Sequence, residues 1–176
     1  DSCALLLLSA AVTDAQSFHV GKCPEPSVQE GFNVTQYTGT WYEIEKLPAM
    51  FERGKCNQAT YSLLSDGTIN SIDGVAKVKD PSQPAILGVS FFKGVPDAPY
   101  WVLSTDYQSY SLVYSCADYF GLFHIDFAWI LARTCVLTEG VISQLHDKLS
   151  AAGVNVNRLT GSDQTGCDGH GLRHRK

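Results

Sequence analysis

Short runs of apolar and aromatic residues follow one another between residues 41 and 133, and turn-forming residues separate them. The runs have strand length and alternate in part with polar residues, which is typical of β-strands with one buried face. Asp66-Gly67 marks a hairpin, because Asp-Gly tolerates the positive φ angles of a type I′ turn. The pattern predicts an all-β barrel or sandwich with strands at residues 41–47, 59–64, 69–78, 86–92, 100–107, 110–116 and 127–132.

A helical pattern replaces this alternation toward the C-terminal end of the chain. Thr138 is placed to cap a helix, and Gly153 lies just past its last apolar position. The apolar side chains that share one helical face are Val141, Ile142, Leu145 and Leu149. A lone helix with one apolar stripe needs a surface to cover, so we expect it to pack on the outside of the sheet.

Residues 1–15 have the features of a signal peptide that is incomplete at its N-terminus. Their apolar run, residues 4–12, is far shorter than the ~20 residues that a membrane-spanning helix needs. Ala15 supplies a small residue at the expected cleavage position. We therefore expect a secreted, extracellular protein with one domain at residues 16–167 and a disordered tail at residues 168–176.

Composition supports a single β-rich domain and excludes one class of partner. The 176 residues suffice for one substantial core, and the aromatic content of 11% suits strands. Net charge is −5 and charged residues make up 18% of the chain. Without a polybasic surface, the chain is not expected to bind nucleic acid.

The chain has six cysteines, whose number is relevant to whether the protein forms disulfides. Removal of Cys3 with the leader leaves five. In an oxidising compartment most of these pair, but four cysteines allow three connectivities and spacing alone does not choose among them. No two have the C-x-x-C spacing of a structural zinc site. His170 and His174 beside Cys167 are interpreted as part of a solvated tail, so no metal site is predicted. Asn33-Val34-Thr35 is an N-glycosylation acceptor.

Three short segments resemble the sequence signatures of the lipocalin family. They are Gly39-Thr40-Trp41-Tyr42, Thr105-Asp106-Tyr107 and residues 127–133, and the run from Pro99 to Arg133 is especially similar to one branch of that family. The resemblance implies an up-and-down antiparallel β-barrel of eight strands, closed at one end and open to an apolar cup at the other. It also implies the disulfides Cys23–Cys116 and Cys56–Cys167, with Cys135 as the odd thiol.

The resemblance further assigns a structural group to the closed end of the barrel. Trp41 plugs that end, and Arg133 lies across its ring in a cation–π contact. Thr105 and Asp106 fit a turn in which the aspartate side chain binds nearby backbone amides. Gly39 belongs to the same structural set.

Two departures from the family pattern affect these expectations. A single Asp-Gly turn joins the runs at residues 59–64 and 69–78, where family members have another strand. We therefore count seven strands, with one missing, and expect an unpaired edge. Asp118 also stands where the related branch has a cysteine, so a disulfide partnership of that cysteine does not carry over to this chain.

The predicted pocket follows from the alternation of side chains along each strand. If Arg133 points inward onto Trp41, then Leu131, Trp129 and Phe127 share its face. The resemblance places the counterparts of Trp129, Trp101 and Tyr37 in the pocket. The full set of expected ligand-binding residues is Trp129, Trp101, Tyr37, Leu103, Tyr114, Leu131, Phe127, Tyr61 and Phe91.

These features predict a secreted carrier of small hydrophobic molecules. An aromatic cup with few charges suits a steroid, a fatty acid such as arachidonate, a retinoid or a bilin. The resemblance implies a role in lipid transport and in protection against oxidative stress. No cofactor and no catalysis are expected, because Cys56 is the expected partner of Cys167 and the histidines form no evident Ser-His-Asp set.

An alternative function rests on apolar loops near the barrel mouth. Tyr119 to Phe123 form one such loop, and Val95 and Pro96 lie in another. These loops fit either a lipoprotein or membrane surface, or a lid over the cup. Cys135 adds the alternative of a disulfide-linked partner or dimer.

Overall fold

The computed structural model describes residues 17–49, 54–71, 74–90, 93–94 and 96–167. The expected leader, the expected tail, and the candidate residues Phe91 and Val95 lie outside these ranges. Within the described residues, no helix is both long and apolar enough to cross a bilayer.

Eight antiparallel strands form the barrel, each paired with the next along the chain. They are β2 (Gly39–Lys46), β3 (Gln58–Leu63), β4 (Ile69–Ser71), β5 (Gly74–Val78), β6 (Ile86–Ser90), β7 (Ala98–Thr105), β8 (Tyr110–Tyr119) and β9 (Phe123–Ala132). The barrel closes because β9 also pairs with β2. Two short strands extend the sheet: β1 (Ser17–Val20) pairs with β9, and β10 (Thr160–Gly161) pairs with β2.

The expected lipocalin-type barrel is confirmed, but the expected count of seven strands is wrong. The run at residues 69–78 is two strands, β4 and β5, and Ser71 pairs directly with Gly74. Only two residues separate Ser71 from Gly74, and the weak alternation of this run concealed a turn that tight. With eight strands, the first and last run antiparallel and pair, so no strand is missing from the barrel.

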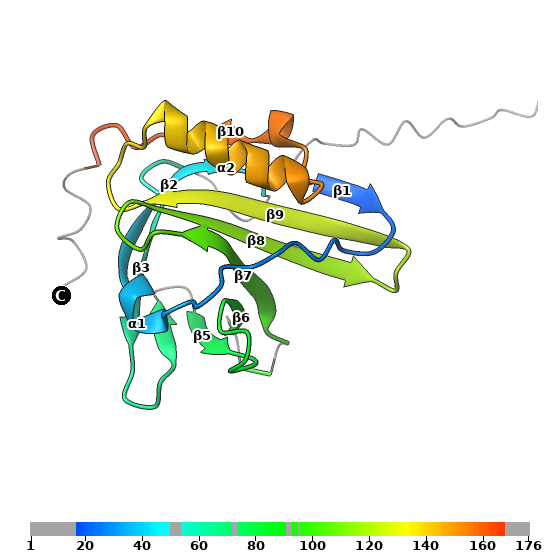
Figure 1. The fold of residues 1–176 in the computed structure, drawn as a ribbon, viewed down its shortest axis with the longest axis horizontal. Coiled ribbons are helices and arrows are strands. Elements are labelled where there is room, and N and C mark those ends of the chain that lie inside the picture. Colours follow the sequence, from blue (N-terminus) through cyan, green and yellow to red (C-terminus); the bar gives the residue numbers. More distant parts are fainter. Residues whose placement is uncertain (1–16, 50–53, 72–73, 91–92, 95, 168–176) are drawn as a thin grey trace, which may run out of the picture.

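A 13-residue helix, α2 (Glu139–Ala151), lies along the outside of the barrel, beside β9 and β8 (Figure 1). This confirms the expected helix, and its buried residues are Leu145 and Leu149. Thr138 occupies the N-cap position, although its side chain makes no capping hydrogen bond. The short helix α1 (Val34–Tyr37) lies between β1 and β2, and the single turn η1 (Val156–Arg158) lies between α2 and β10.

Two hydrophobic clusters divide the faces of the barrel wall. The inner cluster lies inside the barrel and includes Tyr37, Trp41, Val102, Val113 and Leu131. The outer cluster lies between the wall and α2, where Leu145 and Leu149 meet Leu112, Ala128 and Ile130. Residues that alternate along one strand therefore belong to different clusters.

Both disulfides implied by the family resemblance are confirmed. Cys23–Cys116 ties the segment after β1 to β8, and Cys56–Cys167 ties the loop after β2 to the C-terminal segment. Cys135 is half-buried and unpaired. Each bridge closes a loop of roughly 100 residues, which in the chain-entropy model stabilises the fold by about 4.7 kcal/mol.

Candidate ligand-binding site

The closed end of the barrel is built around Trp41. Its indole is fully buried, and the indole Nε1–H donates to the carbonyl of Tyr37 at 2.9 Å. The guanidinium carbon of Arg133 lies 3.7 Å from the ring centroid. This is the distance of a cation–π contact between a half-buried guanidinium and a fully buried ring.

Arg133 also donates hydrogen bonds to backbone carbonyls of three segments. Its Nε donates to Tyr107 O at 2.9 Å, and Nη1 donates to Thr40 O at 3.0 Å. Nη2 reaches the C-terminal carbonyls of α1, the shortest of these contacts being 2.8 Å to Thr38 O. Gly39 sits against this fork with φ +101°, and an added Cβ would lie 3.0 Å from Nη1.

The turn between β7 and β8 completes the closed end. Asp106 Oδ1 accepts the backbone N–H groups of Gln108, Ser109 and Tyr110. Partial burial raises the pKa of this carboxyl, but the hydrogen bonds outweigh that effect and leave the pKa below its usual value. Thr105 Oγ1 donates to Tyr110 O at 2.7 Å. The structure thus brings the five expected structural residues together at one end.

One wall of the interior comes from β9. Leu131 belongs to the inner cluster, and Trp129 packs against it. Across the sheet, Trp129 pairs with Val113 of β8 and Leu131 pairs with Ser111. Phe127 shares their face, and its ring lies 6.1 Å from that of Trp129. These three residues have the facing that the position of Arg133 predicts.

Tyrosine hydroxyls meet inside the barrel. Tyr37 OH lies 2.8 Å from Ser111 Oγ and 3.0 Å from Tyr100 OH, and Tyr61 OH donates to Tyr100 OH at 3.1 Å. Burial raises the pKa of both Tyr37 and Tyr100, so both remain neutral hydrogen-bonding groups at pH 7. Sequence reasoning selected Tyr37 and Tyr61 but missed Tyr100 and Ser111.

Three expected pocket residues have the opposite facing, and their prediction as lining residues is wrong. Trp101, Leu103 and Tyr114 lie in the outer cluster, toward α2. For Trp101 and Leu103 the cause is a β-bulge between Val102 and Ser104, where the pairing of β7 with β8 shifts by one residue. Alternation counted backward from the inward Thr105 therefore fails beyond the bulge. Tyr114 lies on β8 next to the inward Val113, so simple alternation places it on the outer face.

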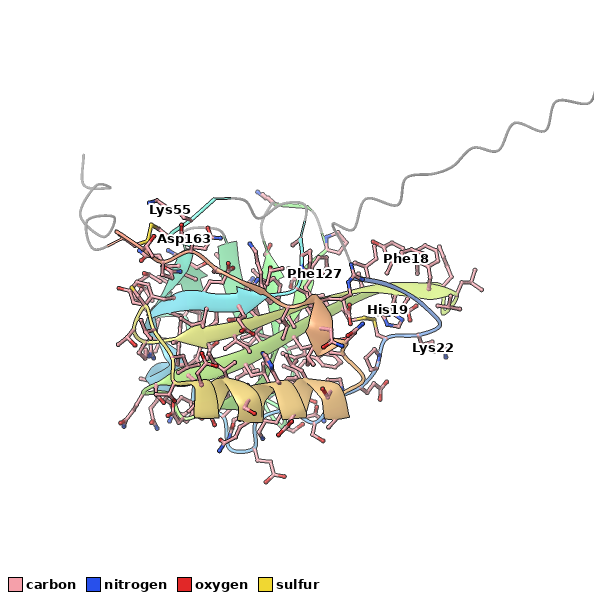
Figure 2. All side chains as sticks on the ribbon, turned by 90° about the horizontal axis from the view of Figure 1, so that it is seen from above. Phe18, His19, Lys22, Lys55, Phe127 and Asp163 are labelled. Atoms are coloured by element: carbon pink, nitrogen blue, oxygen red, sulfur yellow. A yellow bond between two sulfur atoms is a disulfide. The ribbon has the colours of Figure 1, made fainter. Side chains whose placement is uncertain are left out.

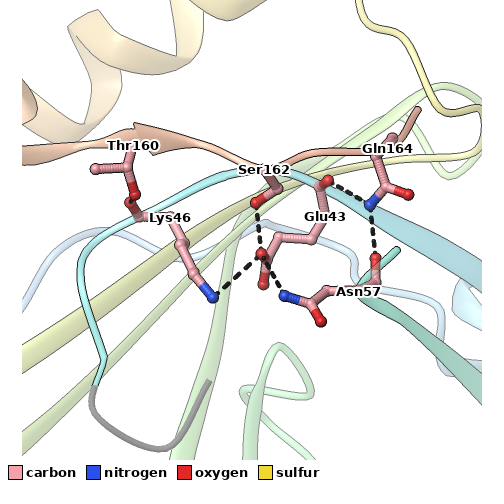
Figure 3. Close-up of polar contacts among 6 residues, drawn as sticks. All are labelled: Glu43, Lys46, Asn57, Thr160, Ser162 and Gln164. Atoms are coloured by element: carbon pink, nitrogen blue, oxygen red, sulfur yellow. Dashed lines mark hydrogen bonds and ion pairs between the residues drawn. The ribbon is translucent and has the colours of Figure 1, made fainter. Parts of the chain in front are cut away.

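A charged pair faces the interior from β2. Glu43 pairs across the sheet with Leu131, and Lys46 pairs with Trp129. Lys46 Nζ lies 3.4 Å from Glu43 Oε1, and this buried carboxylate also accepts hydrogen bonds from Asn57 and Ser162 (Figure 3). The wall beside Trp129 therefore contains a carboxylate whose negative charge is compensated.

A separate hollow of about 760 Å³ lies outside the barrel. It runs between residues 24–30 and the C-terminal end of α2, and Leu103 and Ser104 form part of its lining. Glu25, Glu30 and Lys148 also line it. It belongs to the face opposite the one that carries Trp129.

The closed barrel with a tryptophan plug under an arginine, and a helix packed outside, defines a lipocalin. The family described as "Lipocalin-like domain" matches residues 32–164. The chain belongs to this family.

Within the family, the chain is similar to apolipoprotein D. The mouse (Mus musculus) protein is 49% identical, over 86% of this chain and 87% of that protein. The rat (Rattus norvegicus) protein is 46% identical, over 93% of this chain and 96% of its own length. Among solved structures, insecticyanin of the tobacco hornworm Manduca sexta matches with a TM-score of 0.71 over 86% of this chain and 90% of its own. Its sequence identity of 23% shows the fold alone.

Proposed function

We propose that this protein carries a small hydrophobic molecule inside the barrel. The observation that supports this most directly is the interior itself, where Trp129, Phe127 and Leu131 form an apolar wall above the Trp41 plug. Contact with such a wall removes apolar surface from water at about 25 cal/mol per Å² before the costs of binding. Membership of the lipocalin family and similarity to apolipoprotein D support the same function.

The polar groups of the interior favour a ligand with an apolar body and one neutral polar end. The hydroxyls of Tyr37, Tyr61 and Tyr100 can donate to or accept from a ligand hydroxyl or carbonyl. Lys46 already faces Glu43, so a ligand carboxylate would have to compete with a protein carboxylate. Of the expected classes, steroids and retinoids fit this arrangement better than an ionised fatty acid.

Tryptophan emission tests the site directly. The purified protein is titrated with progesterone, retinol, retinoic acid, arachidonate and biliverdin, and saturable quenching is measured. Trp129→Phe removes the fluorophore that faces the cup, and we expect it to remove most of the quenching. Trp101→Phe is the matched control, because Trp101 lies in the outer cluster and is expected to leave quenching nearly unchanged.

The outcomes separate the possible sites. Saturable quenching that depends on Trp129 supports the barrel site, and retinol binding more tightly than retinoic acid supports the neutral-end assignment. Saturable quenching that is lost in Trp101→Phe instead would move the ligand to the outer side of β7. A folded protein that shows no saturable quenching with any of these ligands would overturn the carrier assignment.

We also infer that the protein is secreted and is not an enzyme. Two disulfides fit an oxidising compartment, and Asn33 is exposed at the N-cap of α1, where a glycan has room. Cys56 is bonded to Cys167, and a thiol in a disulfide is no nucleophile. Glycosidase treatment of the secreted protein tests the glycan by a change in mass.

A second candidate function, binding to a lipid surface, is supported by exposed apolar residues at the tip of the β8–β9 hairpin. Phe120 is 95% exposed and Leu122 is 69% exposed. Stacked rings of Phe18, Phe123 and Tyr119 lie behind them, with centroids 4.8 Å apart in each step. Such a patch fits shallow insertion into a lipoprotein or membrane surface.

Flotation with phosphatidylcholine vesicles tests this second function. Phe120→Ser with Leu122→Ser should abolish binding, whereas Val136→Ser, another residue at 78% exposure, is the matched control. Equal flotation of both variants would contradict the assignment. For Cys135, the proposed disulfide-linked partner predicts a dimer band on a non-reducing gel that Cys135→Ser removes.

A further inference from the structure

Two histidines and an aspartate meet on the outer face of the barrel, where β1 joins β9. His19 of β1 is paired directly with His124 of β9, and Asp126 follows two residues later on the same face as His124. One potential ligand atom from each of the three lies within 4.8 Å of the others. Figure 2 shows His19 at the end of the molecule that also carries Phe18 and Lys22.

Backbone and side-chain contacts already orient His124 and Asp126. His124 Nδ1 lies 2.9 Å from the carbonyl oxygen of Gly21. Because a carbonyl only accepts, Nδ1 carries the hydrogen and Nε2 keeps its lone pair free for a metal. An N–H to carbonyl contact of this kind is how metal-binding histidines are commonly held. Tyr114 OH makes a long contact of 3.5 Å with Asp126 Oδ2, leaving Oδ1 to face His19.

The distance between the other two donors matches a shared ion. His19 Nε2 lies 3.1 Å from Asp126 Oδ1. Two atoms bound to one zinc ion at about 2.1 Å and a tetrahedral angle lie about 3.4 Å apart. The same distance also suits a direct hydrogen bond between His19 and Asp126. The charge of the Asp126 carboxylate therefore distinguishes a shared ion from a direct hydrogen bond.

Charge favours a cation at this position. Asp126 is only 2% exposed, and within the described part of the chain its ion-pair partner is His19. An imidazole compensates the carboxylate only when it is protonated, whereas a divalent cation compensates it whenever the cation is bound. The next acid along the sheet, Asp118, accepts the backbone N–H groups of Cys23 and Gly121 and is thereby engaged elsewhere.

We propose that His19, His124 and Asp126 form a binding site for a divalent transition-metal ion of the zinc type. Two imidazole nitrogens and one carboxylate oxygen suit zinc, copper or nickel, rather than calcium or magnesium, which take oxygen ligands. The side chain of His19 is 31% exposed, so the ion has a path from solvent and room for a water as its fourth ligand. The ion would clamp β1 onto β9, on the face opposite the ligand-facing side of the wall.

Cobalt(II) is the probe, because its visible absorption reports nitrogen and oxygen coordination and zinc displaces it. The full chain is freed of metal with a chelator and titrated with cobalt chloride, then with zinc chloride. All proteins carry Cys135→Ser, His170→Ala and His174→Ala, which removes the unpaired thiol of the described residues and the two histidines beyond them. We expect one saturable cobalt site per chain that zinc displaces.

His19→Gln is the decisive variant, because His19 is partly exposed and its loss should leave the fold intact. Cobalt affinity is expected to fall by at least about tenfold. His146→Gln is the matched control: its Nε2 lies 2.6 Å from Glu45 Oε2, a pairing with the same chemistry but without a second histidine. Asp126→Asn provides a second variant, with the circular dichroism spectrum used to check its fold.

Hydrogen exchange gives a readout that separates a clamp from adventitious binding. Zinc should slow exchange of the β1 amides in the parent but not in His19→Gln. The proposal is overturned if the folded parent binds no cobalt, if His19→Gln binds as tightly as the parent, if His146→Gln loses as much affinity as His19→Gln, or if zinc leaves β1 exchange unchanged.

Discussion

Replacing Arg133 tests whether the closed end holds the barrel together as the contacts indicate. Arg133→Met keeps an unbranched side chain over Trp41 but removes the charge and every hydrogen-bond donor. Arg133→Lys keeps the charge but replaces a planar fork by a single ammonium. The fork matters, because its donors reach carbonyls on three separate segments: at Thr40, at Tyr107 and at the end of α1.

The expected loss can be worked out from these contacts. The cation–π contact of the half-buried guanidinium contributes about 1–2 kcal/mol. Hydrogen bonds to a charged group contribute about 1.5–3 kcal/mol each, but the half-buried carbonyls regain water when the donor is removed, so the sum is discounted strongly. We expect Arg133→Met to lower the free energy of unfolding by about 3 kcal/mol and Arg133→Lys to lower it by about half as much.

Urea unfolding at pH 7, followed by circular dichroism with the disulfides intact, measures this loss. In a chain of this length, 3 kcal/mol corresponds to a fall of about 6–12 °C in the midpoint of thermal unfolding. Lys77→Met, a substitution at an exposed position of β5, is the control and should stay within about 0.5 kcal/mol of the parent. If Arg133→Met also stays within that limit, the closed end does not depend on Arg133 and the reasoning fails.

Two further predictions concern the closed end and the hydroxyl cluster. Asp106→Asn should cost about 1 kcal/mol at pH 7, and urea titrations should show this difference shrinking as pH falls through the native pKa of Asp106, because a lowered native pKa stabilises the fold only while the carboxyl is ionised. Tyr100→Phe should cost about 1 kcal/mol by urea unfolding, because it removes the hydroxyl that joins Tyr37 to Tyr61. If ligands use this cluster, the same variant weakens retinol binding in the quenching assay; unchanged affinity would contradict that assignment.

The sequence predicts the barrel well wherever strands are long and bounded by strong turn signals. The helix at residues 139–151 and the strands that end at Lys46, Leu63 and Ala132 lie close to their expected positions. The error at residues 69–78 comes from a run whose alternation is too weak to reveal the turn between β4 and β5. The strands β1 and β10 escape prediction because each is short and is held by pairing with a distant segment.

The pocket is predicted only as far as alternation stays in phase. Arg133 over Trp41 fixes the facing of β9, and Trp129 follows correctly from it. On β7 a bulge interrupts the alternation, and no residue type in the sequence indicates that bulge. The sequence therefore places Trp101 on the wrong face. The meeting of His19 with His124 is likewise invisible in the sequence, because it depends on the register of a strand that was not predicted.

The inner and outer faces of the barrel wall have different roles, one in ligand binding and the other in stability. The inside of the barrel holds polar groups that a stable core would do without: tyrosine hydroxyls, and the Glu43–Lys46 pair of β2. The outer face is apolar under α2, where Leu145 and Leu149 are fully buried. Stability can therefore be supplied from the outside while the inside remains free to suit a ligand. Substitutions in the outer layer should consequently change the free energy of unfolding without changing ligand affinity, which is why Trp101 is an informative control for Trp129.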